Sequence, residues 1–386
     1  MMSEIVLPRA DGTRAPYRLR GTPLPYPTGG AFPRTAYAAV HVVADPLAMA
    51  DPWNRAALDW DATLAYREHL WSLGFGVAEA MDTSQRGLGL PWPLAAELIE
   101  RACAAARAGN RLIACGAGTD QLDPAVPPTL ADVIAAYEAQ MAHVERHGGR
   151  VILMASRALC RVARGAEDYL RVYGRLIGQA RDKVILHWLG EAFDPALAGY
   201  WGSRDTAVAT ETFLALVHRH AARIDGVKVS LLDAAHETGL RARMPEGVRV
   251  YTGDDFNYPD LIEGDGAHHS HALLGIFDAI APAAAAALAC LGTGDVAGYR
   301  ALLAPTVPLS RRIFEAPTQY YKTGIVFLAW LNGFQQHFVM VGGLQSARGI
   351  LHFADVFRLA DAAGLLRDPD LAVARMRALC VLAGQA

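Results

Sequence analysis

Three consecutive stretches of the chain decide its fold class: residues 183–188 (KVILHW), 207–223 (AVATETFLALVHRHAAR) and 226–231 (GVKVSL). The first and third are short and rich in apolar and β-branched residues, which is typical of strands buried in a sheet. The middle stretch carries apolar residues at helical spacing. A strand, a helix and another strand in this order predict one unit of an α/β fold.

The same alternation recurs along most of the chain. Eight units of strand and helix predict a (β/α)8 TIM barrel, with a doubly wound open sheet as the alternative. The strand candidates are Tyr37–Val43, Gly76–Met81, Arg111–Cys115, Arg150–Ala155, Lys183–Trp188, Gly226–Leu231, Val248–Thr252 and Gly264–His268, and the helical segments between them include Trp92–Ala108, Leu130–His147, Ala166–Gln179 and Ala207–Arg223.

The two ends of the chain depart from this alternation. The first thirty or so residues are rich in Pro, Gly and Arg and predict an extended arm or edge hairpin. From Ala281 onward the pattern is helical, including the segment Leu351–Leu366. We expect an N-terminal arm over residues 1–35, a barrel over 36–280 and a C-terminal helical region over 281–386.

Composition excludes several classes of function. A formal net charge of −3, with no run of Lys and Arg, is not the footprint of a nucleic-acid-binding protein. The longest apolar stretches are too short to span a bilayer, and the first residues do not form a signal peptide. The five cysteines are scattered, as in reduced cytoplasmic proteins. We therefore expect a cytoplasmic protein that binds neither nucleic acid nor membrane.

Lys228 is unusual in this arginine-rich chain. Only three of the 36 basic residues are lysines, and Lys228 lies within an apolar strand candidate. Arginine stays protonated, whereas a desolvated lysine can lose its proton and become a nucleophile. Lys228 is thus a candidate for imine formation with a carbonyl substrate. The alternative is a strand-end lysine whose ammonium reaches water.

Polar residues follow almost every strand candidate, at the end where barrels keep their active sites. Loops are generally polar, so the signal lies in their convergence and not in any one position. The strand-end residues are Asp82, Thr83 and Ser84, then Thr119 and Asp120, Ser156 and Arg157, His187 and Glu191, Asp254 and Asp255, and finally His268, His269 and His271.

Five short motifs stand in a familiar order. Gly226-Val227-Lys228 is similar to a G-[IV]-K strand, and residues 250–255 (VYTGDD) are similar to [VL]-x-S-G-D-D; residues 112–118, 263–266 and 292–295 supply the other three. With these motifs, residues 36–330 resemble the dihydrodipicolinate synthase / N-acetylneuraminate lyase superfamily of class I aldolase barrels. The resemblance implies the barrel fold, an imine-forming Lys228, and a homodimer or tetramer.

His187 stands where members of that superfamily have a tyrosine, at the end of the fifth strand. The resemblance implies that the tyrosine relays protons, and an imidazole titrates near neutral pH and can do the same. We therefore expect His187 to be the catalytic acid and base. The alternative is a buried histidine that binds a backbone carbonyl.

The loop that holds the substrate carboxylate in the superfamily is altered here. Thr83 and Ser84 keep the hydroxyl groups, but Asp82 would repel a carboxylate. We expect Asp82, Thr83, Ser84, Glu191, Asp254, Asp255 and His268 to bind substrate, because carboxylates accept hydrogen bonds from sugar hydroxyls. The prediction is a Schiff-base lyase that acts on a polyhydroxylated keto substrate, such as a keto sugar or keto-deoxy sugar acid, without a cofactor or a metal.

Two alternatives stay open. Histidines 268, 269 and 271, with Asp254 or Glu191, could bind a divalent metal, as in sugar isomerases and class II aldolases. A barrel of this kind could also bind a ligand without catalysis, since fold does not imply function.

Overall fold

The computed structural model describes residues 4–20, 23–26, 29–49 and 51–385. These residues form two compact units. The barrel unit contains Arg34–Val40 and Phe75–Gly275, and the helical unit contains the chain up to Pro33, His41–Gly74 and the chain from Ile276 onward. The three-part division expected from the sequence stays a prediction.

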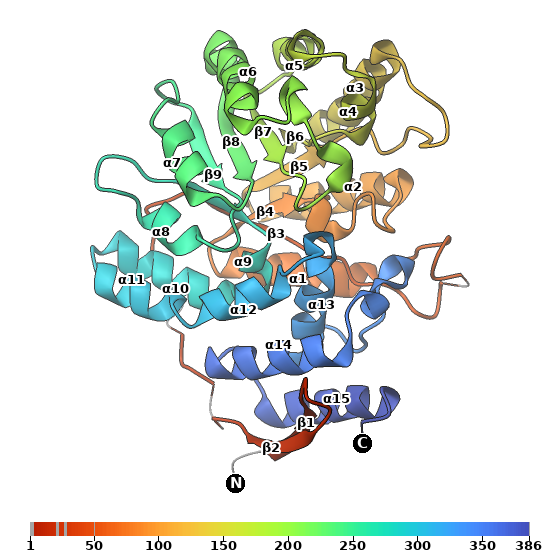
Figure 1. Ribbon diagram of the computed structural model, residues 1–386, viewed down its shortest axis with the longest axis vertical. Helices are drawn as coiled ribbons and strands as arrows, with labels where there is room; N and C mark the ends of the chain where they lie inside the picture. Colours follow the sequence, from red (N-terminus) through yellow and green to blue (C-terminus); the bar gives the residue numbers. More distant parts are fainter. Residues whose placement is uncertain (1–3, 21–22, 27–28, 50, 386) are drawn as a thin grey trace. The chain divides into compact units, whose positions relative to one another are not determined.

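Eight parallel strands close into a barrel within the barrel unit (Figure 1). Their order around the barrel is that of the chain, so each strand pairs with its neighbours in sequence and the last pairs with the first. The (β/α)8 fold is therefore confirmed. The strands are β3 (Ala36–Ala39), β4 (Gly76–Glu79), β5 (Ile113–Ala117), β6 (Arg150–Leu153), β7 (Val184–Leu189), β8 (Ile224–Ser230), β9 (Arg249–Thr252) and β10 (His271–Leu274).

Helices join the strands of this unit, and several have the bounds that the sequence predicts. In α3, Thr129 and Asp132 form a reciprocal capping box at the start, and Gly148 ends the helix with φ +82°. The helices are α2 (Trp92–Ala108), α3 (Leu130–His147), α4 (Arg157–Val162), α5 (Ala166–Gln179), α6 (Thr206–His220), α7 (Ala234–Arg241) and α8 (Tyr258–Glu263), with 3-10 turns η1 (Asp82–Ser84), η2 (Pro195–Leu197), η3 (Tyr200–Gly202) and η4 (Ala221–Arg223).

Alternate residues of the strands fill the barrel interior. Side chains of a strand point to opposite faces in turn, so every second residue faces inward. One buried cluster from seven of the strands and two strand ends comprises Tyr37, Ala39, Ala78, Met81, Ala114, Ile152, Met154, Ile185, Tyr251 and Leu273. The barrel is thus a packed core, with room for chemistry only at its ends.

The last strand lies later in the chain than the sequence predicts. Residues 264–268 form a turn, because Gly264 and Gly266 have positive φ and the Asp265 carboxylate accepts the N–H groups of Ala267 and His268. The strand is His271–Leu274, whose apolar run is buried in the barrel wall. The predicted strand Gly264–His268 is therefore wrong.

The helical unit begins with the expected arm. Strands β1 (Glu4–Pro8) and β2 (Arg14–Arg18) pair as an antiparallel hairpin. The C-terminal region is helical, as predicted. The helices of the unit are α1 (Trp60–Ser72), α9 (Ile276–Ala279), α10 (Ala281–Gly292), α11 (Val296–Leu303), α12 (Thr306–Ile313), α13 (Tyr321–Leu331), α14 (Ile350–Ala362) and α15 (Pro369–Leu382), with 3-10 turns η5 (Thr318–Tyr320) and η6 (Val341–Ala347).

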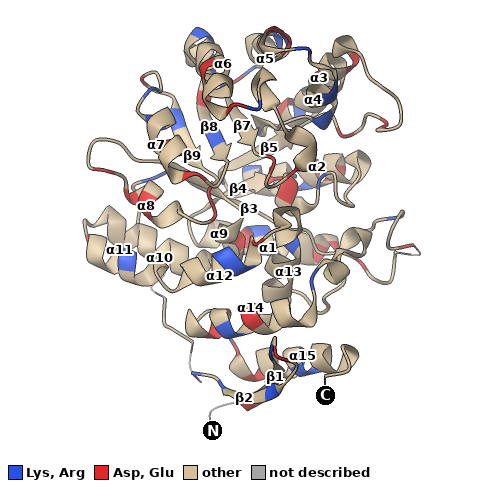
Figure 2. Ribbon diagram, in the orientation of Figure 1, with Lys and Arg blue, Asp and Glu red and all other residues tan. Residues whose placement is uncertain are grey.

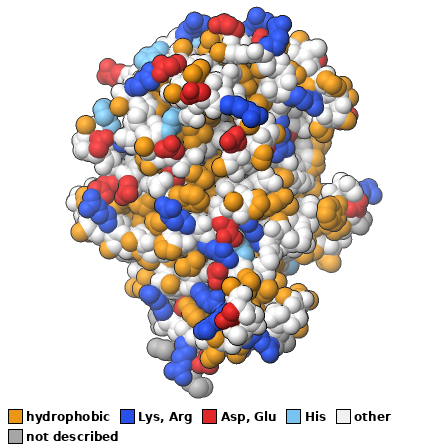
Figure 3. All heavy atoms as spheres, viewed as in Figure 1, with side chains coloured by type: hydrophobic (Ala, Val, Ile, Leu, Met, Phe, Trp, Pro, Cys, Tyr) orange, Lys and Arg blue, Asp and Glu red, His pale blue; other side chains and the backbone are white. Residues whose placement is uncertain are grey.

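Charges of both signs intermingle on the helices. Figure 2 shows basic and acidic residues together on α5 and α6, and Figure 3 shows blue and red side chains mixed over the visible face. Within the described residues, no helix combines the length and hydropathy needed to cross a bilayer.

Candidate active site

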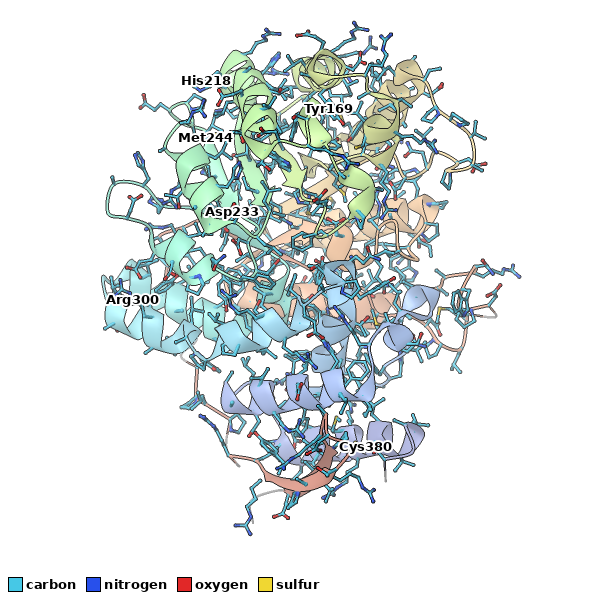
Figure 4. The ribbon with its side chains drawn as sticks, in the orientation of Figure 1. Tyr169, His218, Asp233, Met244, Arg300 and Cys380 are labelled. Atoms are coloured by element: carbon cyan, nitrogen blue, oxygen red, sulfur yellow. The ribbon has the colours of Figure 1, made fainter. Side chains whose placement is uncertain are left out.

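Lys228 and His187 lie side by side on neighbouring strands. They are direct register partners of β8 and β7. Ile185 belongs to the interior cluster, so alternation brings His187, two residues further, to the same inner face. Gly226 likewise faces the ring of Tyr251 inside the barrel, and Lys228 follows two residues later. Both side chains therefore enter the barrel near its carboxyl end. Asp233, labelled in Figure 4, caps the start of the helix that follows β8.

The surroundings of Lys228 favour the neutral amine. Its side chain is 7% exposed. Burial lowers the pKa of the Lys228 ammonium, and the nearby Asp82 and Asp255 carboxylates oppose that shift without cancelling it. No hydrogen bond to Nζ is found within the described part of the chain. A buried amine with a lowered pKa and a free lone pair is suited to nucleophilic attack.

His187 is also held in its neutral form. Burial, and next the charge of Lys228, hold the pKa of the His187 imidazole well below its usual range. Its Nε2 lies 3.2 Å from Ser230 Oγ, and its Nδ1 lies 3.9 Å from Asp82 Oδ2 with no hydrogen-bond partner among the described residues. A neutral imidazole can accept a proton, and Nδ1 is the nitrogen available for it.

Gly253 makes space for these groups. A Cβ atom at this position would lie 2.2 Å from Ser230 Oγ and 2.8 Å from Lys228 Cε. Contacts below 3.0 Å are not tolerated by real side chains, so the backbone of the β9 end can approach Lys228 only without a Cβ. Steric crowding by Ser230 and Lys228 therefore explains why the VYTGDD motif has a glycine at this position.

The loop after β4 brings Asp82 to the pair. It leaves the strand through Ala80 at φ +52° and ends its 3-10 turn at Gln85, φ +65°, both left-handed conformations of non-glycine residues. Such strain is often found at functional sites. Ser84 Oγ donates to the carbonyl of Val40 at 2.6 Å, so this hydroxyl fixes the loop, and Thr83 is buried beside it.

Asp254 and Asp255 have different roles in the loop after β9. Asp254 accepts the N–H groups of Phe256 and Asn257 and the Asn257 side-chain amide, so its carboxylate shapes the turn. Asp255 is 3% exposed and acts electrostatically on Lys228. The sequence could not separate these adjacent acids.

A buried carboxyl group supports this loop from behind. Glu237 of α7 accepts hydrogen bonds from Thr252 Oγ1 at 3.0 Å and Ser270 Oγ at 2.7 Å. Thr252 Oγ1 in turn accepts the N–H of Asp254 at 3.2 Å. Burial raises the pKa of Glu237 to about 7, although the two hydroxyl donors work against that shift.

Two expected substrate-binding residues are exposed. His268 is exposed and precedes β10, so it lies at the amino end of that strand, and its expected position at the carboxyl end is corrected together with the strand. Glu191 is exposed on the loop after β7. Among the residues that the structure describes, no three His, Cys, Asp or Glu side chains are grouped so as to hold a metal ion.

Ser230 and Glu237 were missed in the sequence. Strand alternation could have found Ser230, because it lies two residues after Lys228 on the same face. Glu237 carries no local signal, since its partners Thr252 and Ser270 are distant in the chain.

Comparisons with known proteins agree with this fold. A family model described as "Protein of unknown function (DUF993)" matches residues 5–385, and no curated protein matches the sequence. Three similar solved structures are a monomeric dihydrodipicolinate synthase variant (13% identity, TM-score 0.64, covering 86% of this chain and 97% of that one), a dihydrodipicolinate synthase of Bacillus anthracis (14%, 0.62, 86% and 98%) and an E. coli K12 prophage protein of the dihydrodipicolinic acid synthase family in complex with pyruvate (13%, 0.63, 92% and 100%).

The TM-scores show that these structures share the fold of this chain, and they confirm the resemblance to the superfamily at the level of the fold. The family model covers nearly the whole chain. The chain thus belongs to the DUF993 family, and its fold is similar to that of dihydrodipicolinate synthases.

Proposed function

We propose that this protein is a Schiff-base-forming lyase, of the aldolase or dehydratase type, in which Lys228 attacks the ketone of a polyhydroxylated keto substrate. One observation carries the proposal: a buried lysine with a lowered pKa faces the interior directly beside a neutral histidine. Few structural roles need an amine in that state, because an unpaired buried lysine destabilises the fold.

The reaction balances without an added oxidant or reductant. The Lys228 amine forms a bond to the carbonyl carbon, and the resulting carbinolamine takes up one proton from solvent and loses water to give a protonated imine; the final hydrolysis returns that proton. A base removes the proton of the substrate β-hydroxyl, the carbon–carbon bond breaks, and its electron pair enters the imine as an enamine. Protonation of the enamine at carbon and addition of water to the imine then release the second product and the free amine.

His187 is the proposed proton carrier. Its Nδ1 takes the hydroxyl proton and returns it to the enamine carbon, a role that requires the neutral imidazole favoured by burial. Ser230 Oγ binds Nε2 and so holds the ring in place.

The carboxylates near the amine favour a hydroxyl-rich substrate. Asp82 and Asp255 act electrostatically on Lys228 from two loops. Carboxylates accept hydrogen bonds from hydroxyl groups and repel a substrate carboxylate. We therefore favour a keto sugar or the hydroxylated end of a keto-deoxy sugar acid over pyruvate, and keep Thr83 and Glu191 as further candidates for binding it. We also propose that the protein is cytoplasmic and forms a homo-oligomer.

The test is reductive trapping with the full chain. The protein is incubated with pyruvate, dihydroxyacetone, a ketohexose or a keto-deoxy sugar acid, borohydride is added, and peptides are mapped by mass spectrometry. The other two lysines are internal controls: Lys183 is exposed, and Lys322 is 3% exposed with its Nζ bound to the Gln319 carbonyl at 3.0 Å.

A reduced adduct confined to Lys228 supports the proposal and names the substrate class. Equal labelling of Lys183 would mean non-specific amine chemistry. No adduct at Lys228 with any ketone would reject the imine mechanism in favour of a ligand-binding or metal-dependent barrel.

A further inference from the structure

The helical unit contains a cavity of about 250 Å³. Its walls come from α1, α9, α10, α13, the loops after α13 and α14, and the N-terminal segment, all within that unit. Ligand pockets for drug-sized molecules have about 300–1,000 Å³, so this cavity suits a smaller molecule. None of the residues discussed around Lys228 lines it.

Two of the lining side chains hold unused hydrogen-bond donors. Arg367 is exposed and lies with its guanidinium carbon 4.6 Å from the ring centre of Phe334, without an ion-pair partner in the described ranges. Asn332 is only 8% exposed; its Oδ1 accepts the backbone N–H of Arg367 at 2.9 Å, whereas its amide Nδ2 has no bond to any residue that the structure describes. Asn332 lines the cavity, so this amide can donate a hydrogen bond to a ligand acceptor there.

His69 adds a third polar group to the cavity. Its ring lies 4.6 Å from that of Phe334, and neither ring nitrogen has a hydrogen-bond partner within the described residues. A neutral imidazole can offer one N–H, and a protonated one can offer two.

The one acid in the lining is largely engaged. Asp278 is fully buried, and its Oδ2 accepts the His41 backbone N–H and faces His41 Nδ1, each at 2.8 Å. Its Oδ1 has no partner among the described residues and repels negative charge. An anionic group is therefore expected at the Arg367 end of the cavity and away from Asp278.

The remaining lining is apolar. Phe334, Leu328, Leu365 and Pro282 contribute an aromatic ring and aliphatic side chains. Such walls bind the apolar body of a ligand, while a few polar groups fix its orientation.

We propose that this cavity binds a small organic carboxylate with an apolar body, whose carboxylate accepts hydrogen bonds from Arg367 and Asn332. The site is separate from the Lys228 chemistry and does not depend on it. Guanidinium binds carboxylate with two parallel hydrogen bonds, which makes Arg367 the main determinant.

The experiment is calorimetric titration of the full chain with four probes: benzoate, the matched neutral benzyl alcohol, the matched cation benzylamine, and inorganic phosphate. We expect benzoate alone to bind measurably. Arg367→Gln should weaken benzoate at least about tenfold, since a hydrogen bond to a charged group is lost. Asn332→Asp keeps the acceptor for the Arg367 backbone N–H but adds a negative charge, so it should weaken benzoate binding to a similar extent.

Arg9→Gln is the matched control, because Arg9 is an exposed arginine in the β1–β2 turn of the same unit and does not line the cavity. It should bind benzoate like the wild type, and so should Lys228→Met. The proposal is overturned if benzoate does not bind at millimolar concentration, if benzyl alcohol or phosphate binds as well, or if Arg367→Gln leaves its affinity unchanged. Because benzoate binding does not depend on Lys228, the titrations test this proposal even if no imine adduct forms at Lys228.

Discussion

Two charged residues on β8, Asp225 and Lys228, lie three positions apart in opposite surroundings. Asp225 accepts a hydrogen bond from Tyr251 at 2.6 Å and pairs with Arg249 at 2.8 Å and with Arg150. Burial opposes its ionisation, yet the Tyr251 hydrogen bond and the two arginines lower the pKa of Asp225. Lys228 has no hydrogen bond within the described residues, and its pKa is lowered toward the neutral form.

The difference separates a structural end of the barrel from the end where we propose that the chemistry takes place. At the amino end, an extra residue in β8 makes the contact possible: Ile224 and Gly226 pair with consecutive residues of β7, so Asp225 is bulged. Its charge is satisfied and stabilises the barrel. At the carboxyl end, the amine of Lys228 has no hydrogen bond, which reduces the stability of the fold but makes the amine more reactive. Active sites often show this trade-off between stability and reactivity.

The largest effect is expected from removing the amine. Lys228→Met should lower turnover on the order of 10⁴-fold, because the nucleophile is lost. The free energy of unfolding should stay the same or rise by about 1 kcal/mol, because an apolar side chain of similar length replaces a buried amine. Steady-state kinetics and urea unfolding measure both, and retained turnover would remove Lys228 from the mechanism.

A substitution at the amino end of the barrel should change stability and leave the reactivity of Lys228 unchanged. Asp225→Asn removes the charge shared by Arg150, Arg249 and Tyr251, and should cost about 2 kcal/mol of unfolding free energy. The arginines are partly exposed and can regain water, which keeps the loss moderate. Glu246→Gln, an exposed acid before β9, is the control and should be neutral. A changed adduct yield at Lys228 in a folded Asp225→Asn protein would mean that the two ends are coupled.

His187 should make the carboxyl end sensitive to acid. Its folded pKa lies below the unfolded value of about 6.5, so the unfolded chain binds more protons and stability falls as pH drops below that value. Between pH 7 and pH 5, the free energy of unfolding of His187→Gln should therefore fall by about 1–2 kcal/mol less than that of the wild type. His218, labelled in Figure 4 on α6, is exposed, so His218→Gln should behave like the wild type. Identical pH profiles for all three proteins would contradict a buried neutral His187.

The smallest expected effect concerns the charge beside the amine. Asp82 raises the pKa of Lys228 against the effect of burial, so Asp82→Asn should lower it further. Because imine formation needs the neutral amine, the rise of trapping rate with pH should move toward acid. Asp182→Asn, at an exposed site before β7, should leave the profile in place. A shift toward alkali would mean that Asp82 does not act on Lys228 through its charge.

Sequence periodicity predicted much of the fold. The helices α2, α3 and α5 have the predicted bounds, because each has apolar residues at helical spacing. The prediction of the eighth strand is wrong, because two positive-φ glycines and the Asp265 side chain make residues 264–268 a turn. That single error also misplaced His268.

The candidate site was predictable only in part. Lys228 stood out by residue type and by its apolar strand, and His187 by its place at a strand end. Ser84 and Asp254 were chosen for the right loops, yet their side chains fix backbone turns. Which polar atom of a loop is used by its own backbone depends on local geometry that residue type does not reveal.

The elements and their order follow from the amino-acid sequence alone, because hydrophobic period and capping chemistry are local properties of the chain. Which residues meet at Lys228 depends instead on how the chain folds. Asp82, His187 and Asp255 are far apart in the sequence and come together because the sheet closes into a barrel in a defined register. The same closure buries the amine and so lowers its pKa, a property that belongs to the folded environment and not to the lysine itself.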